Sequence, residues 1–209
     1  MIPVVTPDEM AAVDAAVPVP AATLIERAGA AVAFEARALL GGAYGRRVLV
    51  VAGKGNNGAD GRVAAGLLSR WGARCDVVDP DRAAAHLSAP TARACDLVID
   101  AAFGTGLRAG WNPPPQPDAP VLAVDLPSGV DAATGFDHGS WRAAATVAFG
   151  ALKPGLLLHP GAAQAGRVRL AEIGPEIAAG VDAVARAHLL EDADADALAA
   201  TPPADSHKW

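Results

Sequence analysis

Residues 47–61 read RVLVVAGKGNNGADG, and this stretch decides the fold class. The first six residues, from Arg47 to Ala52, are almost continuously apolar, which is typical of a parallel strand buried on both faces. A glycine-rich loop follows, and Val63, Leu67 and Trp71 then recur at helical spacing. A buried strand, a glycine turn and a helix in this order predict a strand-helix-strand unit of an α/β protein.

The rest of the chain repeats this alternation. Apolar runs predict five more strands, at residues 75–78, 97–100, 121–125, 146–149 and 168–170. A capping box of Thr6 and Glu9, with Pro7 between them, predicts a helix start, and apolar spacing predicts a second helix over residues 23–40. Residues 104–120 lack helical periodicity and contain three consecutive prolines, so we expect an irregular connection there.

The composition excludes several classes of protein. The 209 residues are 52% hydrophobic with a net charge of -6, which excludes a disordered chain and argues against nucleic acid as a partner. We see no apolar run near the roughly 18–20 residues of a membrane span, and no signal peptide. Cys75 and Cys95 are expected as buried free thiols rather than a bridge, and the five histidines lack metal-ligand spacing. These features predict a cytoplasmic protein that neither spans nor binds a membrane.

The glycine loop is a literal G-x-G-x-x-G, formed by Gly53, Gly55 and Gly58. Asp76 and Asp79 follow about 20 residues later, where a dinucleotide-binding fingerprint places its ribose-binding acid. Taken alone the loop fits an NAD(P)-dependent oxidoreductase, and it also fits a simple turn. It is not a Walker loop, because no Gly-Lys-Ser or Gly-Lys-Thr follows.

Polar residues also end the later strands. Asp100 and Asp125 are expected at one rim of the sheet, as a catalytic or binding pair or as caps of nearby backbone N–H groups. Ser128 lacks the setting of a hydrolase nucleophile. Lys153, in a glycine- and proline-rich turn, either contacts a phosphate or reacting group or is a solvated lysine.

Six short motifs, in order and with characteristic spacing, extend this picture. They are Glu26-Arg27-Ala28-Gly29 and residues 53–61, 100–106, 124–129, 131–135 and 149–156. With these motifs taken together, the sequence from about Thr6 to Gly174 resembles the YjeF N-terminal domain family, the NAD(P)H-hydrate epimerases. The resemblance implies a three-layer α/β/α Rossmann-like fold with a mostly parallel central sheet. It also implies interconversion of the R and S forms of hydrated NADH and NADPH, damaged cofactors with a hydroxyl at C6 of the reduced ring.

The resemblance implies that Asp125 touches the substrate and that Asn57, Asp100 and Ser128 hold a potassium ion. Loss and return of the hydroxyl at C6 needs a carboxylate that donates and then accepts a proton, and we expect Asp125 to be this catalytic residue. The remaining substrate-binding residues form two loops: Asn56, Asn57, Gly58, Ala59 and Asp60, and Gly104, Thr105, Gly106, Leu107, Arg108, Ala109 and Gly110. The sequence departs from the family at Ala59, where a glycine is usual, and in the proline-rich residues 108–117, where a helix is usual.

Residues 1–175 are expected to form the epimerase domain and residues 176–209 a linker or tail. Residues 205–209 (DSHKW) resemble the opening of the ADP/ATP-dependent NAD(P)H-hydrate dehydratase domain, so we expect a fused dehydratase as partner. A homodimer is expected from the family alone. Two alternatives to an epimerase remain: a non-catalytic dimerising or binding module of the same fold, and the oxidoreductase above.

Overall fold

Six parallel strands form the central sheet of the structure, a computed structural model that describes residues 1–88, 95–106 and 113–194. Their order is β3-β2-β4-β5-β6-β7. The strands are β2 (Arg47–Ala52), β3 (Arg74–Val78), β4 (Leu97–Ala101), β5 (Val121–Val124), β6 (Ala145–Phe149) and β7 (Arg167–Ala171). All six strands predicted from the sequence are therefore confirmed, and every neighbouring pair in this sheet runs parallel.

Burial follows each strand's place in the sheet. Of the four inner strands, β4, β5 and β6 are buried at every residue, and β2 is buried from Val48 onward. The edge strands β3 and β7 are exposed or partly buried at every position except Ala171. The apolar runs predicted that both faces of the sheet are covered. This prediction holds for the centre of the sheet and fails at its edges.

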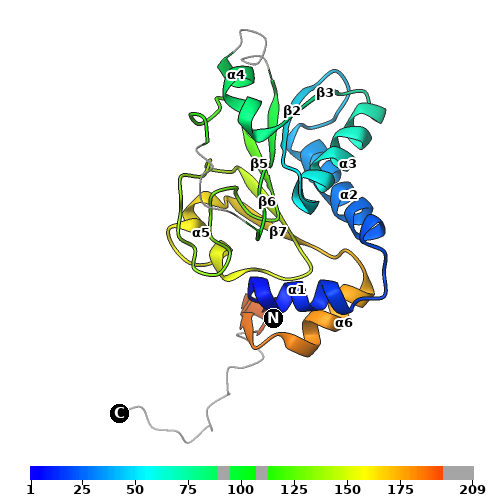
Figure 1. The fold of residues 1–209 in the computed structure, drawn as a ribbon, viewed down its shortest axis with the longest axis vertical. Helices are drawn as coiled ribbons and strands as arrows, with labels where there is room; N and C mark the ends of the chain where they lie inside the picture. Colours follow the sequence, from blue (N-terminus) through cyan, green and yellow to red (C-terminus); the bar gives the residue numbers. More distant parts are fainter. Residues whose placement is uncertain (89–94, 107–112, 195–209) are drawn as a thin grey trace, which may run out of the picture.

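Helices cover both faces of the sheet, which gives the expected three layers (Figure 1). The long helices α2 (Ala21–Leu39) and α3 (Asn56–Arg70) pack on the face formed by Val48, Val50 and Ala52. Ala83 of α4 (Ala83–Ser88) packs with Trp141 on the opposite face. The remaining short helices are η1 (Pro80–Arg82), η3 (Pro154–Leu156) and α5 (Gly161–Gln164).

One buried ion cluster ties α2 to the edge of the sheet. Glu35 is 2% exposed, and its two carboxylate oxygens accept hydrogen bonds from Arg167 at 2.5 Å and Arg169 at 2.8 Å. Both arginines lie on β7 and reach solvent. The helix that walls one side of the candidate site is thereby held against the last strand.

The two ends of the described chain meet beside the sheet (Figure 1). Strand β1 (Ile2–Val4) pairs antiparallel with β8 (Ala187–Leu189), and α1 (Pro7–Ala16) packs on α6 (Pro175–Val184). The predicted capping box at the start of α1 is present. No helix in the described ranges is long and apolar enough to cross a membrane.

Part of the stretch expected as a linker is folded. Ile177 and Val181 of α6 are 0% and 1% exposed, so this helix packs on α1, and β8 pairs with β1. Pro175 at the first helical position and the helical spacing of Ile177 and Val181 were the available signals. The dehydratase-like residues 205–209 lie outside the described residues. Cys75 and Cys95 are free, as predicted, but half-buried rather than buried.

Candidate active site

Glycines let the loop after β2 fold tightly against its neighbours. A Cβ atom on Gly53 would lie 2.0 Å from the carbonyl oxygen of Ala102, and one on Gly58 would lie 1.9 Å from the carbonyl oxygen of Gly53. Helix α3 begins directly after Gly55, and no side chain caps its first turn. Its first N–H groups are therefore free to bind an anionic group, as helix N-termini commonly do.

Asn57 holds two buried polar atoms in this first turn. Neither its Nδ2 nor its Oδ1 has a hydrogen-bond partner within the described part of the chain. A buried amide without partners costs free energy, so a ligand that satisfies it is favoured. Gly104 approaches from the loop after β4, where a Cβ atom would lie 3.3 Å from Asn57 Cγ.

Asp100 and Ser128 form a buried polar pair behind this loop. Asp100, the fourth residue of β4, accepts hydrogen bonds from the Ser128 hydroxyl at 2.6 Å and the Ser128 N–H at 2.9 Å. The Ser128 oxygen also lies 3.0 Å from the carbonyl oxygen of Phe103. Burial raises the pKa of Asp100 to about 6, and the hydrogen bonds from Ser128 and Ala102 oppose that rise.

These residues suit an alkali cation. The Ser128 hydroxyl lies within hydrogen-bond distance of both an Asp100 carboxylate oxygen and the Phe103 carbonyl oxygen. The Asn57 amide oxygen lacks a partner among the described residues. Hard cations prefer such carboxylate, hydroxyl and carbonyl oxygens. Within the described ranges no three His, Cys, Asp or Glu residues cluster to hold a metal ion. One carboxylate with neutral oxygens therefore fits a potassium ion.

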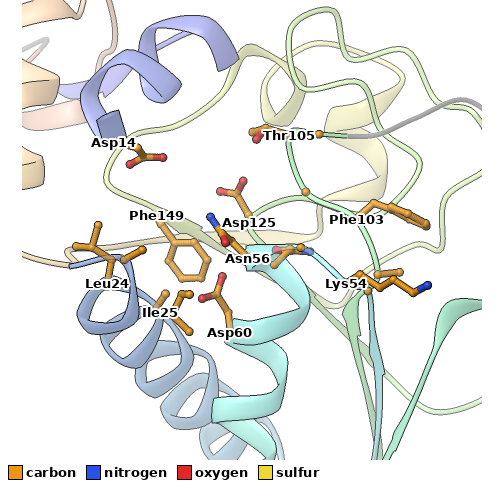
Figure 2. A pocket seen from close by; sticks show the side chains of 18 of the residues that line it. Asp14, Leu24, Ile25, Lys54, Asn56, Asp60, Phe103, Thr105, Asp125 and Phe149 are labelled. Carbon is orange, nitrogen blue, oxygen red and sulfur yellow. The ribbon is translucent and has the colours of Figure 1, made fainter. Parts of the chain in front are cut away.

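Asp125 follows β5 and has a backbone conformation that residues other than glycine rarely adopt. Its φ angle is 67°, so the residue predicted as the last of the strand instead turns out of it. Aspartate tolerates this left-handed region better than most residues. The turn directs the carboxylate into the cavity at the carboxyl edge of the sheet (Figure 2).

Lys153 is the partner of Asp125. Its side chain is 2% exposed, and its Nζ donates hydrogen bonds to Asp125 Oδ1 at 2.6 Å and to the Phe149 carbonyl oxygen at 3.0 Å. The interpretation of Lys153 as a solvated lysine is therefore wrong. Lys153 comes four residues after the end of a buried strand, and this position was the available signal that it lies near the site. The spacing alone did not identify Asp125 as its partner.

Asp60 lies in the second turn of α3 and faces the same cavity (Figure 2). It is 6% exposed, and no described residue forms a hydrogen bond or ion pair with its side chain. Burial, with a smaller contribution from the charge of Asp125, raises the pKa of Asp60 to about 8. This carboxyl group therefore carries a proton at neutral pH.

The cavity has a volume of about 1600 Å³, larger than the roughly 300–1,000 Å³ typical of small-molecule sites. Most of the predicted substrate-binding residues within the described ranges line it: Asn56, Asn57, Asp60, Gly104, Thr105, Gly106 and Asp125. Gly58 packs closely against Gly53, and Ala59 occupies the first turn of α3, as expected. Leu107, Arg108, Ala109 and Gly110 lie outside the described residues.

Some cavity residues were not predicted from the sequence. Leu24 and Ile25 of α2 form an apolar wall, Phe149 lies beside them, and Asp14 of α1 faces the opening (Figure 2). Burial raises the pKa of Asp14. The helical spacing of Leu24 predicted a buried position on α2. Periodicity does not distinguish a residue that packs in the core from one that lines a cavity, so this role of Leu24 was not predicted.

These features define an α/β protein whose ligand site lies at the carboxyl edge of a parallel sheet. The profile of the family described as "YjeF-related protein N-terminus" matches residues 21–87 and 79–155, and this chain belongs to that family. The crystal structure of yeast ynu0 shares the fold, with a TM-score of 0.60 and 23% identity over 73% of this chain and 82% of the yeast chain.

Two curated relatives are similar in sequence. The protein named bifunctional NAD(P)H-hydrate repair enzyme Nnr from Mycobacterium tuberculosis H37Rv is 40% identical over 166 residues, which is 69% of this chain and 34% of the relative. The protein named NAD(P)H-hydrate epimerase from Weissella koreensis is 36% identical over 159 residues, which is 61% of this chain and 71% of the relative. The chain thus spans about a third of the Nnr protein.

Proposed function

We propose that this chain is an NAD(P)H-hydrate epimerase, an isomerase that interconverts the R and S forms of hydrated NADH and NADPH. The observation that carries the proposal is the pair of Asp125 and the buried Lys153 in a cavity large enough for a dinucleotide. Relatives that bear the name NAD(P)H-hydrate epimerase support the substrate class.

The reaction requires little more than proton transfer. C6 of the hydrated ring carries both a hydroxyl and the ring nitrogen, so loss of the hydroxyl leaves a planar iminium ion. Water then adds back to either face. Asp125, which accepts a 2.6 Å hydrogen bond from an ammonium group, is arranged to take the proton of that water.

Substrate binding follows from the same geometry. The uncapped first turn of α3 would hold a phosphate of the dinucleotide, and Asn56 lines the cavity beside it. Thr105 and Gly106 would contact the substrate from the loop after β4. The apolar wall of Leu24 and Ile25 would exclude water from one side of the ring.

A potassium ion would be held by Asn57, Asp100 and Ser128. When bound, it would supply positive charge beneath the glycine loop and fix the loop after β4. Thermal unfolding in potassium chloride against tetramethylammonium chloride tests this proposal. Stabilisation by potassium that Ser128→Ala removes is expected, and equal melting in both salts would reject the ion.

The proposal extends to partners and location. A dehydratase domain or protein would consume one epimer, so the epimerase would make both epimers available to it. The half-buried free thiols of Cys75 and Cys95 fit the reducing cytoplasm. The homodimer stays a prediction, which the molar mass measured by light scattering would test.

Chromatography of the separated epimers of hydrated NADH tests the activity. In potassium buffer the wild-type protein should bring one purified epimer to the equilibrium mixture faster than buffer alone. A non-catalytic module would leave the spontaneous rate unchanged. An oxidoreductase would instead change the absorbance at 340 nm when NADH and carbonyl substrates are added, and we expect no such change.

A further inference from the structure

The proposed reaction uses Asp125 as its proton acceptor and needs a separate proton donor. The Asp125 carboxylate already accepts a hydrogen bond from Lys153, and both side chains are largely buried, at 13% and 2% exposure. The Lys153 ammonium is engaged by Asp125 and by the Phe149 carbonyl oxygen. The departing hydroxyl, however, needs a proton before it leaves as water.

The stereochemistry also requires two groups. Epimerisation removes the hydroxyl from one face of the ring and returns water to the opposite face. A single carboxylate on one side of the planar iminium reaches one face. The second face needs its own group from another wall of the cavity.

We propose that Asp60 is the catalytic acid that protonates the departing hydroxyl, a role that rests on the proposed epimerase function. Asp60 rises from α3, whereas Asp125 comes from the end of β5, so the two carboxyl groups enter the cavity from different elements (Figure 2). The Asp60 side chain forms no hydrogen bond or ion pair with a described residue, which leaves its proton available to a ligand.

The surroundings of Asp60 keep it neutral. Helix α2 contributes Leu24, Ile25 and Ala28 to the cavity wall. Among the residues that the structure describes, the charged groups that line the cavity on other elements are Asp14 of α1, Lys54 of the glycine loop, Asp79 and Asp81 at η1, Asp125 and Lys153. Among these, Asp125 opposes ionisation of Asp60, and burial opposes it more strongly. Two carboxyl groups in contrasting environments are a common arrangement for an acid and a base.

The step balances as follows. The C6–O bond breaks, the oxygen leaves as water with the Asp60 proton, and the nitrogen lone pair forms the C6=N double bond. A water oxygen then bonds to C6 on the other face, its proton passes to Asp125, and the nitrogen regains its lone pair. Asp60 ends ionised and Asp125 protonated. Before the next turnover, Asp125 releases its proton to solvent water and Asp60 takes a proton from solvent water, which restores the starting state. Conversion of the opposite epimer runs the same steps backward.

Asp60→Asn tests the role, because asparagine keeps the shape and polarity but has no acidic proton. We expect kcat to fall by about 100-fold or more, with little change in KM, as for loss of a general acid. The wild-type rate should decline above about pH 8, and this decline should be absent from the residual Asp60→Asn rate. Asp60→Glu, which retains an acidic proton, should keep the decline.

Asp182→Asn is the matched control, since Asp182 is an exposed carboxylate on α6. Its rate and pH profile should equal those of the wild type. An Asp60→Asn protein that keeps the wild-type kcat and only raises KM would overturn the acid role and leave the epimerase proposal standing. A wild-type protein that fails to accelerate equilibration overturns both.

Discussion

The Lys153 ammonium lies 2.6 Å from the Asp125 carboxylate, in a site where the lysine is 2% exposed and the aspartate adopts a φ angle of 67°. The loop after β6 therefore supplies the ion-pair partner of a residue that follows β5. The strained conformation and the buried cation together place one carboxylate in the cavity.

Removal of the lysine charge should impair both stability and activity. Lys153→Met keeps much of the apolar stem but leaves Asp125 unpaired, and breaking a buried ion pair costs roughly 3–5 kcal/mol. We expect kcat to fall about 100-fold, because the Asp125 carboxylate loses the ammonium group that holds it in place. Epimer chromatography measures kcat, and urea unfolding measures the loss of stability. An unchanged kcat in the folded variant would contradict the assigned role.

The glycine loop offers a matched pair of substitutions within one helix. Gly58→Ala places a Cβ atom 1.9 Å from the Gly53 carbonyl oxygen, so the loop must move and activity should be lost. At Gly66, exposed on the same helix, nothing lies within 4 Å of an added Cβ atom. Gly66→Ala should preserve activity and raise the free energy of unfolding by about 0.5–1 kcal/mol. Equal activity in the two variants would show that the loop tolerates displacement.

The raised pKa of Asp60 predicts how stability depends on pH. The folded protein holds this proton up to about pH 8, whereas the unfolded chain releases it near pH 4, so the contribution of Asp60 to stability is lost as pH rises through that window. Asp60→Asn removes the effect. Urea unfolding at pH 5 and pH 9 should show the variant gaining stability relative to the wild type. A constant difference between the two proteins would mean that Asp60 ionises normally.

Much of the fold followed from the sequence because its strongest signals are local. Continuous apolar runs identified the inner strands of the parallel sheet, shorter runs that include Asp76 and Arg169 identified its two edge strands, and the capping box marked the start of α1. Helix α6 was missed although Ile177 and Val181 recur at helical spacing, because the Ala- and Asp-rich residues around them were interpreted as a linker. Only its packing on α1, at the opposite end of the sequence, reveals why Ile177 and Val181 are buried.

The site was predictable where motifs carry it and not where distant segments meet. Residues 53–61 and Asp125 were identified from strand ends, and the structure brings them to one cavity. The partner of Asp125 was not identified, because Lys153 is 28 residues away and its burial depends on the turn after β6. The raised pKa of Asp60 likewise depends on burial in the folded cavity, which no sequence spacing records.

The most direct test compares the wild-type protein with Asp125→Asn in the equilibration of separated hydrated NADH epimers, followed by chromatography in potassium buffer. Asparagine has nearly the same shape and tolerates the left-handed conformation of this residue, so the variant should fold, with thermal unfolding as the check. We predict that the wild type accelerates equilibration and that Asp125→Asn leaves it at the spontaneous rate. Near-normal turnover by the folded variant would contradict the account.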